Sequence, residues 1–311
     1  MHNMSNLEWF EYIKIFGSKP GLETIKKLLK LLGDPQNDFE SIHVTGTNGK
    51  GSTTAITASI FQAASYKVGM FTTPHLSKVT ESIKVNNQDI HVSIMNTILT
   101  RIREKIDYLL IQEIRHPTHF EVLVALAFEY FASHDVDIAV VEVGMGGRDD
   151  ATNVLKSMTS IITNIGLEHT KYLGKDLITI AENKAGILKK GTSLISSVTQ
   201  PQVIAKLESI VNKKQCELIR IDKDYTITQL ESNLNEQNFT IQTPKQTLMN
   251  LKISLLGSHQ LRNAACAIAA AETAQKKGFR IKPIDIQNGI STTIWPGRFE
   301  IIDKNPLIIL D

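Results

Sequence analysis

The stretch that decides the fold is IHVTGTNGKGSTT, residues 42–54. Its first residues are mostly apolar or β-branched, which predicts a short buried strand over residues 41–45. Glycines follow at positions 46, 49 and 51, and the periodicity from Ser52 to about residue 65 predicts a helix. A glycine-rich turn between a strand and a helix is the setting that a phosphate-binding loop requires.

The residue types within this turn suit the phosphates of a nucleotide. Glycines let backbone N–H groups approach phosphate oxygens, and the N-terminus of the helix adds a partial positive charge. Lys50 would neutralise the β and γ phosphates, and Ser52 or Thr53 would bind Mg²⁺. The match to the usual pattern is imperfect, because Val44 replaces its first glycine and Gly51 separates Lys50 from Ser52. The alternative is a glycine-rich turn that binds no ligand.

Apolar runs alternate with segments of helical periodicity along most of the chain. The predicted strands cover residues 66–72, 137–144, 160–166 and 192–198, and the predicted helices cover residues 22–32, 91–114, 118–133, 176–188 and 201–214. The run at 137–144 is almost entirely apolar, which is typical of a parallel sheet covered on both faces. This alternation predicts an α/β fold with a doubly wound, mostly parallel sheet.

The pattern changes towards the C-terminal end. Residues 225–256 alternate polar and apolar side chains, which predicts a small antiparallel β segment attached to the main sheet. An alanine-rich helix is predicted over residues 259–277. Within residues 297–311, the segments RFEII and PLIIL predict two more strands.

The composition excludes several classes of protein. The 311 residues are 42% hydrophobic and 21% charged, with a net charge of +2, so disordered, collagen-like and coiled-coil classes do not fit. We find no basic run typical of nucleic-acid binding and no apolar stretch near the roughly 18 residues that span a bilayer. Two cysteines, Cys216 and Cys266, and the lack of a hydrophobic signal core predict a cytoplasmic protein without nucleic-acid or membrane partners.

The form GTNGKGS resembles the phosphate loop of the folylpolyglutamate synthase and dihydrofolate synthase family, within the Mur ligase superfamily. The resemblance extends from about residue 17 to residue 311 through a series of stretches in the same order, which are KPGLETIKKLLKLLGDPQ, FTTPHL, THFEVLVALAF, VVEVGMGGRDDATNV, TNIGLEHTKYLG, AENKAGILKKG, GSHQLRNAACAIAA and WPGRFE. It implies an ATP-dependent ligase that joins glutamate to a folate or pteroate carboxylate.

The resemblance also implies which residues bind ATP. They comprise the whole loop and four later positions, which are Gly46, Thr47, Asn48, Gly49, Lys50, Gly51, Ser52, Thr53, Gln260, Asn263, Arg298 and Asp311. Arg298 is similar to an arginine that reaches an ATP phosphate, and Asp311 to a residue that contacts the ribose. Gln260 and Asn263 have an alternative interpretation, in which they cap and pack the start of the alanine-rich helix.

A second set of residues is implied to bind two Mg²⁺ ions. Glu142 ends an apolar strand, where α/β folds place their ligands. The resemblance implies metal ligands at Ser52, Thr73, Glu142, His169 and Lys184, the last after carbamylation of its amine. Catalytic roles are implied for Lys50, His169 and Lys184. Glu168 stands where the family usually has aspartate, and the alternative for Lys184 is an ordinary surface lysine.

The resemblance divides the chain unequally. Residues 1–296 correspond to the ATP-binding domain, and residues 297–311 to the start of a smaller, Rossmann-like glutamate ligase domain that is nearly absent. Because the chain ends at Asp311, where the family continues, we expect a homologue truncated before most of its C-terminal domain. Its last two strands would then lack sheet partners and covering helices.

The sequence therefore predicts a monomeric enzyme that adds L-glutamate to folate, to dihydropteroate or to both, through an acyl phosphate. Its small-molecule partners would be ATP, the folate or dihydropteroate, and glutamate, with Mg²⁺ as cofactor. Truncation would impair this activity. Two alternatives are a catalytically inactive, ATP-binding remnant and another Mur-type ligase that acts on cell-wall precursors.

Overall fold

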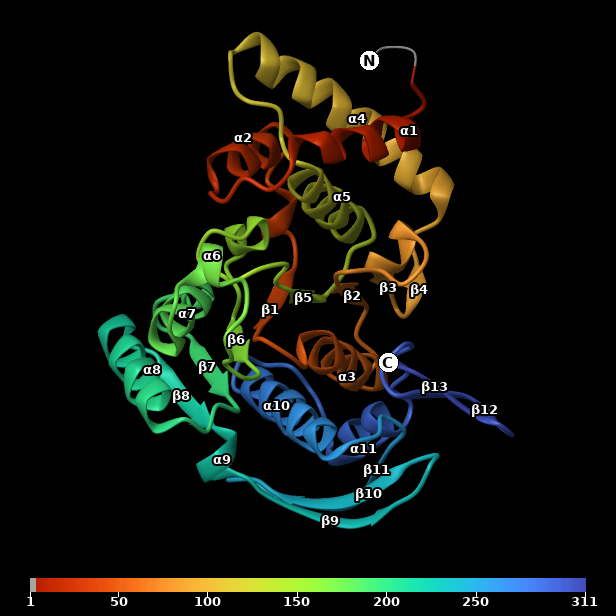
Figure 1. The fold of residues 1–311 in the computed structure, drawn as a ribbon, viewed down its shortest axis with the longest axis vertical. Coiled ribbons are helices and arrows are strands. Elements are labelled where there is room, and N and C mark those ends of the chain that lie inside the picture. Colours follow the sequence, from red (N-terminus) through yellow and green to blue (C-terminus); the bar gives the residue numbers. More distant parts are fainter. Residues whose placement is uncertain (1–3) are drawn as a thin grey trace.

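An eight-stranded sheet runs through the middle of the computed structural model, which describes residues 4–311 (Figure 1). The strands lie in the order β4-β3-β2-β5-β1-β6-β7-β8. Their bounds are β1 (Glu40–Thr45), β2 (Val68–Phe71), β3 (Ile83–Val85), β4 (Gln88–Asp89), β5 (Ile138–Glu142), β6 (Thr159–Ile162), β7 (Ser193–Ser196) and β8 (Glu217–Arg220). The six strands from β2 to β8 in this order are parallel, and β3 and β4 add an antiparallel edge. The predicted doubly wound, mostly parallel α/β fold is confirmed.

The central strands are buried on both faces because successive side chains point to opposite sides of a sheet. In β5, Val140 packs into a core on one face and Val141 into a second core on the other, and neither is exposed. A continuous apolar run is therefore needed at this position. The same arrangement brings the carboxyl ends of β1, β5 and β6 together at one edge.

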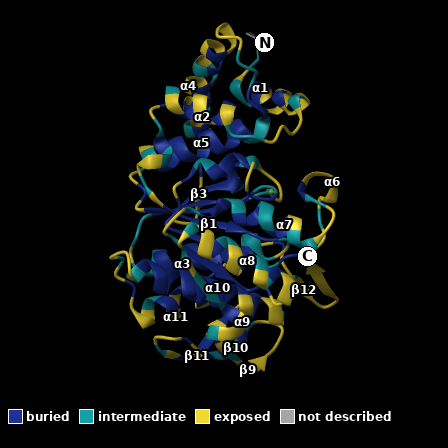
Figure 2. Ribbon diagram, turned by 90° about the vertical axis from the view of Figure 1, so that its left-hand side faces the viewer, coloured by how far each residue is buried: buried dark blue, intermediate teal, exposed yellow. Residues whose placement is uncertain are grey.

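Helices cover both faces of the sheet (Figure 1). One face carries α1 (Asn6–Tyr12), α2 (Glu23–Leu31), α4 (Val92–Ile111), α5 (His119–Ser133), α7 (Leu177–Lys184) and α8 (Pro201–Lys214). The opposite face carries α3 (Lys50–Ala63), α10 (Ser258–Gln275) and α11 (Pro283–Ser291). Two short helices, α6 (Thr170–Leu173) and α9 (Ile221–Asp224), lie in connections. Figure 2 shows the buried residues concentrated between these layers.

The antiparallel segment differs from its prediction in one respect. β9 (Thr226–Ser232), β10 (Gln237–Gln242) and β11 (Thr247–Ile253) form a separate three-stranded sheet and are not attached to the main one. Their inward side chains, including Phe239 and Ile241, pack against α10 and α11 (Figure 1). Alternation predicted strands correctly, but the two helices lie between these strands and the main sheet.

The last two strands also differ from expectation, because they have sheet partners. β12 (Glu300–Lys304) and β13 (Leu307–Leu310) pair with each other as an antiparallel hairpin. Their side chains are mostly exposed, as Ile302 is 58% exposed and Leu307 51%. A local hairpin satisfies backbone hydrogen bonds without burying the side chains.

Several elements were not predicted from the sequence, namely the helices α1, α6, α9 and α11 and the strands β3, β4 and β8. Each is short, and β8 shows intermediate or exposed side chains in place of an apolar run. None of the helices within residues 4–311 has the length and hydrophobicity that a membrane crossing requires.

Candidate active site

The loop between β1 and α3 has the conformation that the sequence predicts for a phosphate-binding turn. Gly46 has a φ of 151°, and a Cβ atom there would lie 1.8 Å from Thr163 Oγ1. Gly49, with a φ of 80°, precedes α3 and provides no side-chain cap for the helix. The N–H groups of the first turn of α3 are thus left without a capping side chain, an arrangement that suits an anion.

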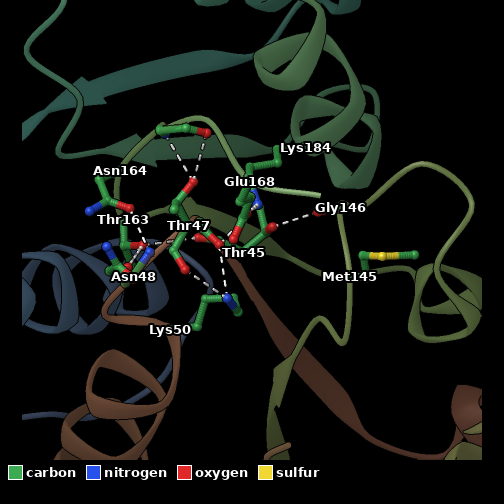
Figure 3. Close-up of polar contacts among 12 residues, drawn as sticks. Thr45, Thr47, Asn48, Lys50, Met145, Gly146, Thr163, Asn164, Glu168 and Lys184 are labelled. Carbon is green, nitrogen blue, oxygen red and sulfur yellow. Dashed lines mark hydrogen bonds and ion pairs between the residues drawn. The ribbon is translucent and has the colours of Figure 1, made fainter. Parts of the chain in front are cut away.

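The segment after β6 fastens this loop from one side (Figure 3). Thr163 Oγ1 donates to the carbonyl of Asn48 at 2.6 Å, and the backbone N–H of Asn48 donates to Asn164 Oδ1 at 2.8 Å. Thr47 Oγ1 accepts from the N–H of Gly166 at 2.9 Å. These bonds define the loop conformation before any ligand binds, which lowers the cost of ordering it.

Two lysines converge on the same carbonyl group of the loop (Figure 3). Lys50 Nζ donates to Gly46 O at 3.0 Å and to Thr47 O at 3.1 Å. Lys184 Nζ donates to Gly46 O at 2.9 Å and lies 2.5 Å from Glu168 Oε1. Burial lowers the pKa of Lys184, while Glu168 acts in the opposite direction. Lys184 is 1% exposed, so it is a buried cation beside the phosphate loop and not a surface residue.

A buried carboxylate lies at the carboxyl end of β5, beside the end of β1. Glu142 is 4% exposed and pairs in register with Val44 of β1. Its Oε2 accepts from the backbone N–H of Thr73 at 3.2 Å. Burial raises the pKa of Glu142 to about 7, against the lowering effect of Lys50. A nearby cation would favour the ionised form of this carboxyl group.

Helix α10 lies on the same face of the sheet as α3 and contacts the loop there. Gln260 Nε2 donates to Ser52 Oγ at 3.3 Å, and Asn263 Nδ2 donates to Gln260 Oε1 at 2.9 Å. Asn263 also lies against Gly49. Both side chains are buried, so they contact the loop itself in addition to packing the start of α10.

The remaining predicted positions have no hydrogen bond to the two lysines or to Glu142 among the contacts described above. His169 is exposed and has a positive φ of 42° at the start of α6. Arg298 is near enough for its charge to lower the pKa of Glu142. Asp311 Oδ1 accepts from the N–H of Phe299, and Thr53 Oγ1 is buried without a partner among the described residues. Within residues 4–311, no three His, Cys, Asp or Glu side chains are grouped to bind a metal.

Sequence reasoning missed the residues that fasten the loop. Thr163 and Asn164 directly follow the apolar strand β6, the same strand-end position that identified Glu142. That signal was sufficient to find them. Trp295 was also missed, and its ring packs so closely on Gly51 that a Cβ there would lie 2.7 Å from it. This contact joins positions far apart in the chain and has no local signal.

A cavity of about 510 Å³ lies next to the carboxyl end of β5. Its walls are the segment 14–21, the start of α5 and the loop that follows Glu142. Phe120 and His119 supply aromatic surface, and Lys14 and Lys19 supply positive charge. We name it the substrate cavity, since its size is within the range of small-molecule sites.

Comparison with known proteins places these features in a family context. Residues 44–271 match the Mur ligase middle domain. The chain is 36% identical over 298 residues to dihydrofolate synthase/folylpolyglutamate synthase of Bacillus subtilis (strain 168), covering 95% of this chain and 69% of that protein. It is 34% identical over 289 residues to folylpolyglutamate synthase of Lacticaseibacillus casei, covering 92% and 68%.

The fold also matches solved structures over nearly the whole chain. An FPGS–AMPPCP–folate complex superposes with a TM-score of 0.92 at 33% identity, covering 99% of this chain and 76% of that one. AMPPCP is a non-hydrolysable analogue of ATP. The similarity therefore extends over the loop, the substrate cavity and the terminal hairpin.

Proposed function

The chain belongs to the folylpolyglutamate and dihydrofolate synthase family of Mur ligases, and from this premise we propose an ATP-dependent reaction at the loop of residues 46–53. Members of this family are ATP-dependent ligases. In the proposed reaction the γ-phosphoryl group passes to a carboxylate oxygen of a folate or dihydropteroate, giving an acyl phosphate and ADP. The amine of glutamate then attacks the acyl carbon and displaces phosphate, forming the amide. The convergence of Lys50 and Lys184 on the loop best supports this proposal.

The two lysines suit phosphoryl transfer because negative charge accumulates on the transferred group. Lys50 lies over the loop, and it would turn from the carbonyls of Gly46 and Thr47 towards the phosphates. Loop N–H groups and the start of α3 would bind the remaining phosphate oxygens. We propose the nucleotide contacts at residues 46–53, Gln260, Asn263, Arg298 and Asp311.

The residues present fit one Mg²⁺ ion. Mg²⁺ prefers oxygen ligands and usually takes one or two from protein, with water and phosphate completing its shell. Ser52 Oγ and the Glu142 carboxylate are oxygen atoms that can bind a metal ion. The charge of the ion would offset the effect of burial, which raises the pKa of Glu142. When bound, the ion would neutralise the phosphates and orient them. We therefore propose Ser52 and Glu142 as its ligands.

A second Mg²⁺ site requires a change at Lys184. We propose that it comprises the carbamate of Lys184 together with His169 and Thr73. Burial favours the neutral amine that carbamylation needs, but Glu168 pairs with the ammonium form. Glu168 would have to move away. Intact-mass measurement with and without added bicarbonate would detect the carbamate.

The substrate cavity is the proposed site of the folate or dihydropteroate. Its aromatic side chains suit a planar ring system, and its lysines suit a carboxylate. Thr73 and Pro74 line it, and the N–H of Thr73 donates to Glu142, so a carboxylate at that end of the cavity would lie near Glu142. We also propose that residues 1–296 form the nucleotide-binding domain and residues 297–311 begin a second one. The monomeric state and cytoplasmic location are likewise proposals.

The test is release of phosphate from ATP by the purified chain. We expect release that depends on both glutamate and either dihydropteroate or a folate, and that Lys50→Ala reduces roughly 100-fold. The matched control is Lys277→Ala, an exposed lysine beyond the end of α10. ATP binding without turnover would support the inactive remnant instead. Turnover only with a cell-wall precursor would support another Mur-type ligase.

A further inference from the structure

A second cavity, of about 620 Å³, lies between α7, α8 and the loop after β5, away from the phosphate loop. Four cationic side chains line it, which are Arg148, Lys190, Lys213 and Lys214. We name it the basic cavity. The whole chain has a net charge of only +2, so this concentration of positive charge is a local feature.

Carboxylates do not offset these cations. Glu182 is the one acidic side chain that lines the cavity within residues 4–311, and it is already paired with Lys206. Lys214 Nζ donates to the backbone carbonyl of Leu188. Burial lowers the pKa of Lys214, and the charge of Arg148 acts in the same direction. The cations thus repel one another, and an anion in the cavity would relieve that repulsion.

The helix dipole explains only part of this arrangement. Lys213 and Lys214 lie in the last turn of α8, where cations stabilise the helix C-terminus. Arg148 follows β5, and Lys190 precedes β7, so neither belongs to that helix. Positive charge from three separate segments converges on one cavity, which points to a ligand and not to helix stability alone.

The basic cavity and the substrate cavity are lined by neighbouring residues of two segments, 148–149 and 182–183, which we name the ridge. Arg148 lines the basic cavity and the next residue, Asp149, lines the substrate cavity. In α7, Glu182 lines the basic cavity and the next residue, Asn183, lines the substrate cavity. The backbone N–H of Arg148 donates to the carbonyl of Asn183 at 2.9 Å, which joins the two sides of the ridge. A flexible chain that extends from one cavity into the other would cross this ridge.

We propose that the basic cavity binds the oligo-γ-glutamate chain of a lengthened folate, through the α-carboxylates that the chain carries. The inference rests on the proposed function, since the acceptor carboxylate must stay beside the phosphate loop. Each added glutamate then lengthens the part of the substrate that has to leave the substrate cavity. Repeated α-carboxylates along a γ-linked chain match cations from three segments, whereas a monoglutamate is too short to occupy both cavities.

The test compares the affinities of pteroylmonoglutamate and pteroylpenta-γ-glutamate by calorimetry on the full chain. We expect the pentaglutamate to bind about tenfold more tightly, with a steeper loss of affinity at high salt. Lys190→Glu combined with Lys213→Glu should remove most of this preference and leave monoglutamate binding unchanged. The control combines Lys223→Glu with Lys277→Glu, exposed lysines elsewhere, and should keep the preference.

Equal loss of both affinities in the double variant, or the same loss in the control, would overturn the proposal. If pteroylmonoglutamate does not bind at all, the proposed function fails, and the basic cavity is then tested with free penta-γ-glutamate alone. Its binding, weakened by the double variant but not by the control, supports the inference. Binding of inorganic tripolyphosphate without binding of penta-γ-glutamate contradicts it and identifies a phosphate site instead.

Discussion

Replacing Gly46 by alanine tests whether the phosphate loop depends on close packing against the strand beside it. The new Cβ would lie 1.8 Å from Thr163 Oγ1, 3.1 Å from Thr163 Cβ and 3.2 Å from the backbone nitrogen of Asn164. Rotation of the threonine side chain would relieve only the first contact, at the cost of its hydrogen bond to the Asn48 carbonyl. If Thr163 keeps its rotamer and this hydrogen bond, the loop must move by roughly 1.6 Å to bring the shortest contact to an ordinary distance. If the side chain rotates, the other two contacts still require a shift of a few tenths of an ångström.

This displacement has two expected consequences. Overpacking and the φ of 151° should lower the free energy of unfolding by about 2–4 kcal/mol. Because Lys50 and Lys184 both bind the Gly46 carbonyl, the movement also misplaces them, and a shift of about 1 Å or more predicts about a 100-fold loss of ATP affinity. Chemical denaturation and calorimetric titration with ATP and Mg²⁺ measure the two effects.

A matched control separates crowding from backbone strain. Gly191 also has a positive φ, 74°, but a Cβ there would meet no atom within 4 Å, so Gly191→Ala should cost only about 1 kcal/mol. Adding Thr163→Ala to Gly46→Ala should restore part of the stability, since the shortest contact is removed. The reasoning is refuted if Gly46→Ala keeps the wild-type ATP affinity and destabilises the protein no more than Gly191→Ala does.

Three further predictions concern single side chains. Because burial raises the pKa of Glu142 from 4.5 to about 7, its ionisation costs stability as the pH rises through that window. Without Mg²⁺, the unfolding free energy of Glu142→Gln should rise relative to that of wild type by about 3 kcal/mol as the pH goes from 4.5 to 8. Parallel pH profiles of the two unfolding free energies would contradict this. Trp295 packs on Gly51 whereas Trp9 is buried in the other core, so ATP should change the tryptophan fluorescence and Trp295→Phe should abolish the change. A response that persists in Trp295→Phe disproves the assignment. Tyr225 donates to the buried carboxylate of Glu272 at 2.9 Å, so Tyr225→Phe should lower the unfolding free energy by about 1–3 kcal/mol, and an unchanged denaturation midpoint would count against it.

The fold was predictable where local pattern and burial agree. Apolar runs, helical periodicity and the glycine turn identified the central strands and most helices, and the predicted bounds of α8 are those observed. The separate sheet of β9 to β11 was misplaced because alternation shows that one face is buried but not what covers it. Here α10 and α11 cover it. The pairing of β12 with β13 was also missed, because the residues of one strand do not indicate which strand it will pair with.

The candidate site was predictable in part. A polar residue at the end of an apolar strand indicated Glu142, and the same rule would have found Thr163 and Asn164. The pairing of Glu168 with Lys184 had no such signal, because the two residues belong to different segments and meet only once α7 packs beside β6. The contact of Trp295 with Gly51 is of the same kind.

The sequence by itself determined the strand–loop–helix of the phosphate loop and the α/β alternation around it, because glycine positions and hydrophobic period act on neighbouring residues. The tertiary structure alone decided the charge state of the site and the partners of its lysines. Burial raises the pKa of Glu142, and packing of distant segments brings Glu168 to Lys184 and four cations to the basic cavity. Desolvation and Coulomb interaction depend on distance in space, which the order of residues along the chain does not contain.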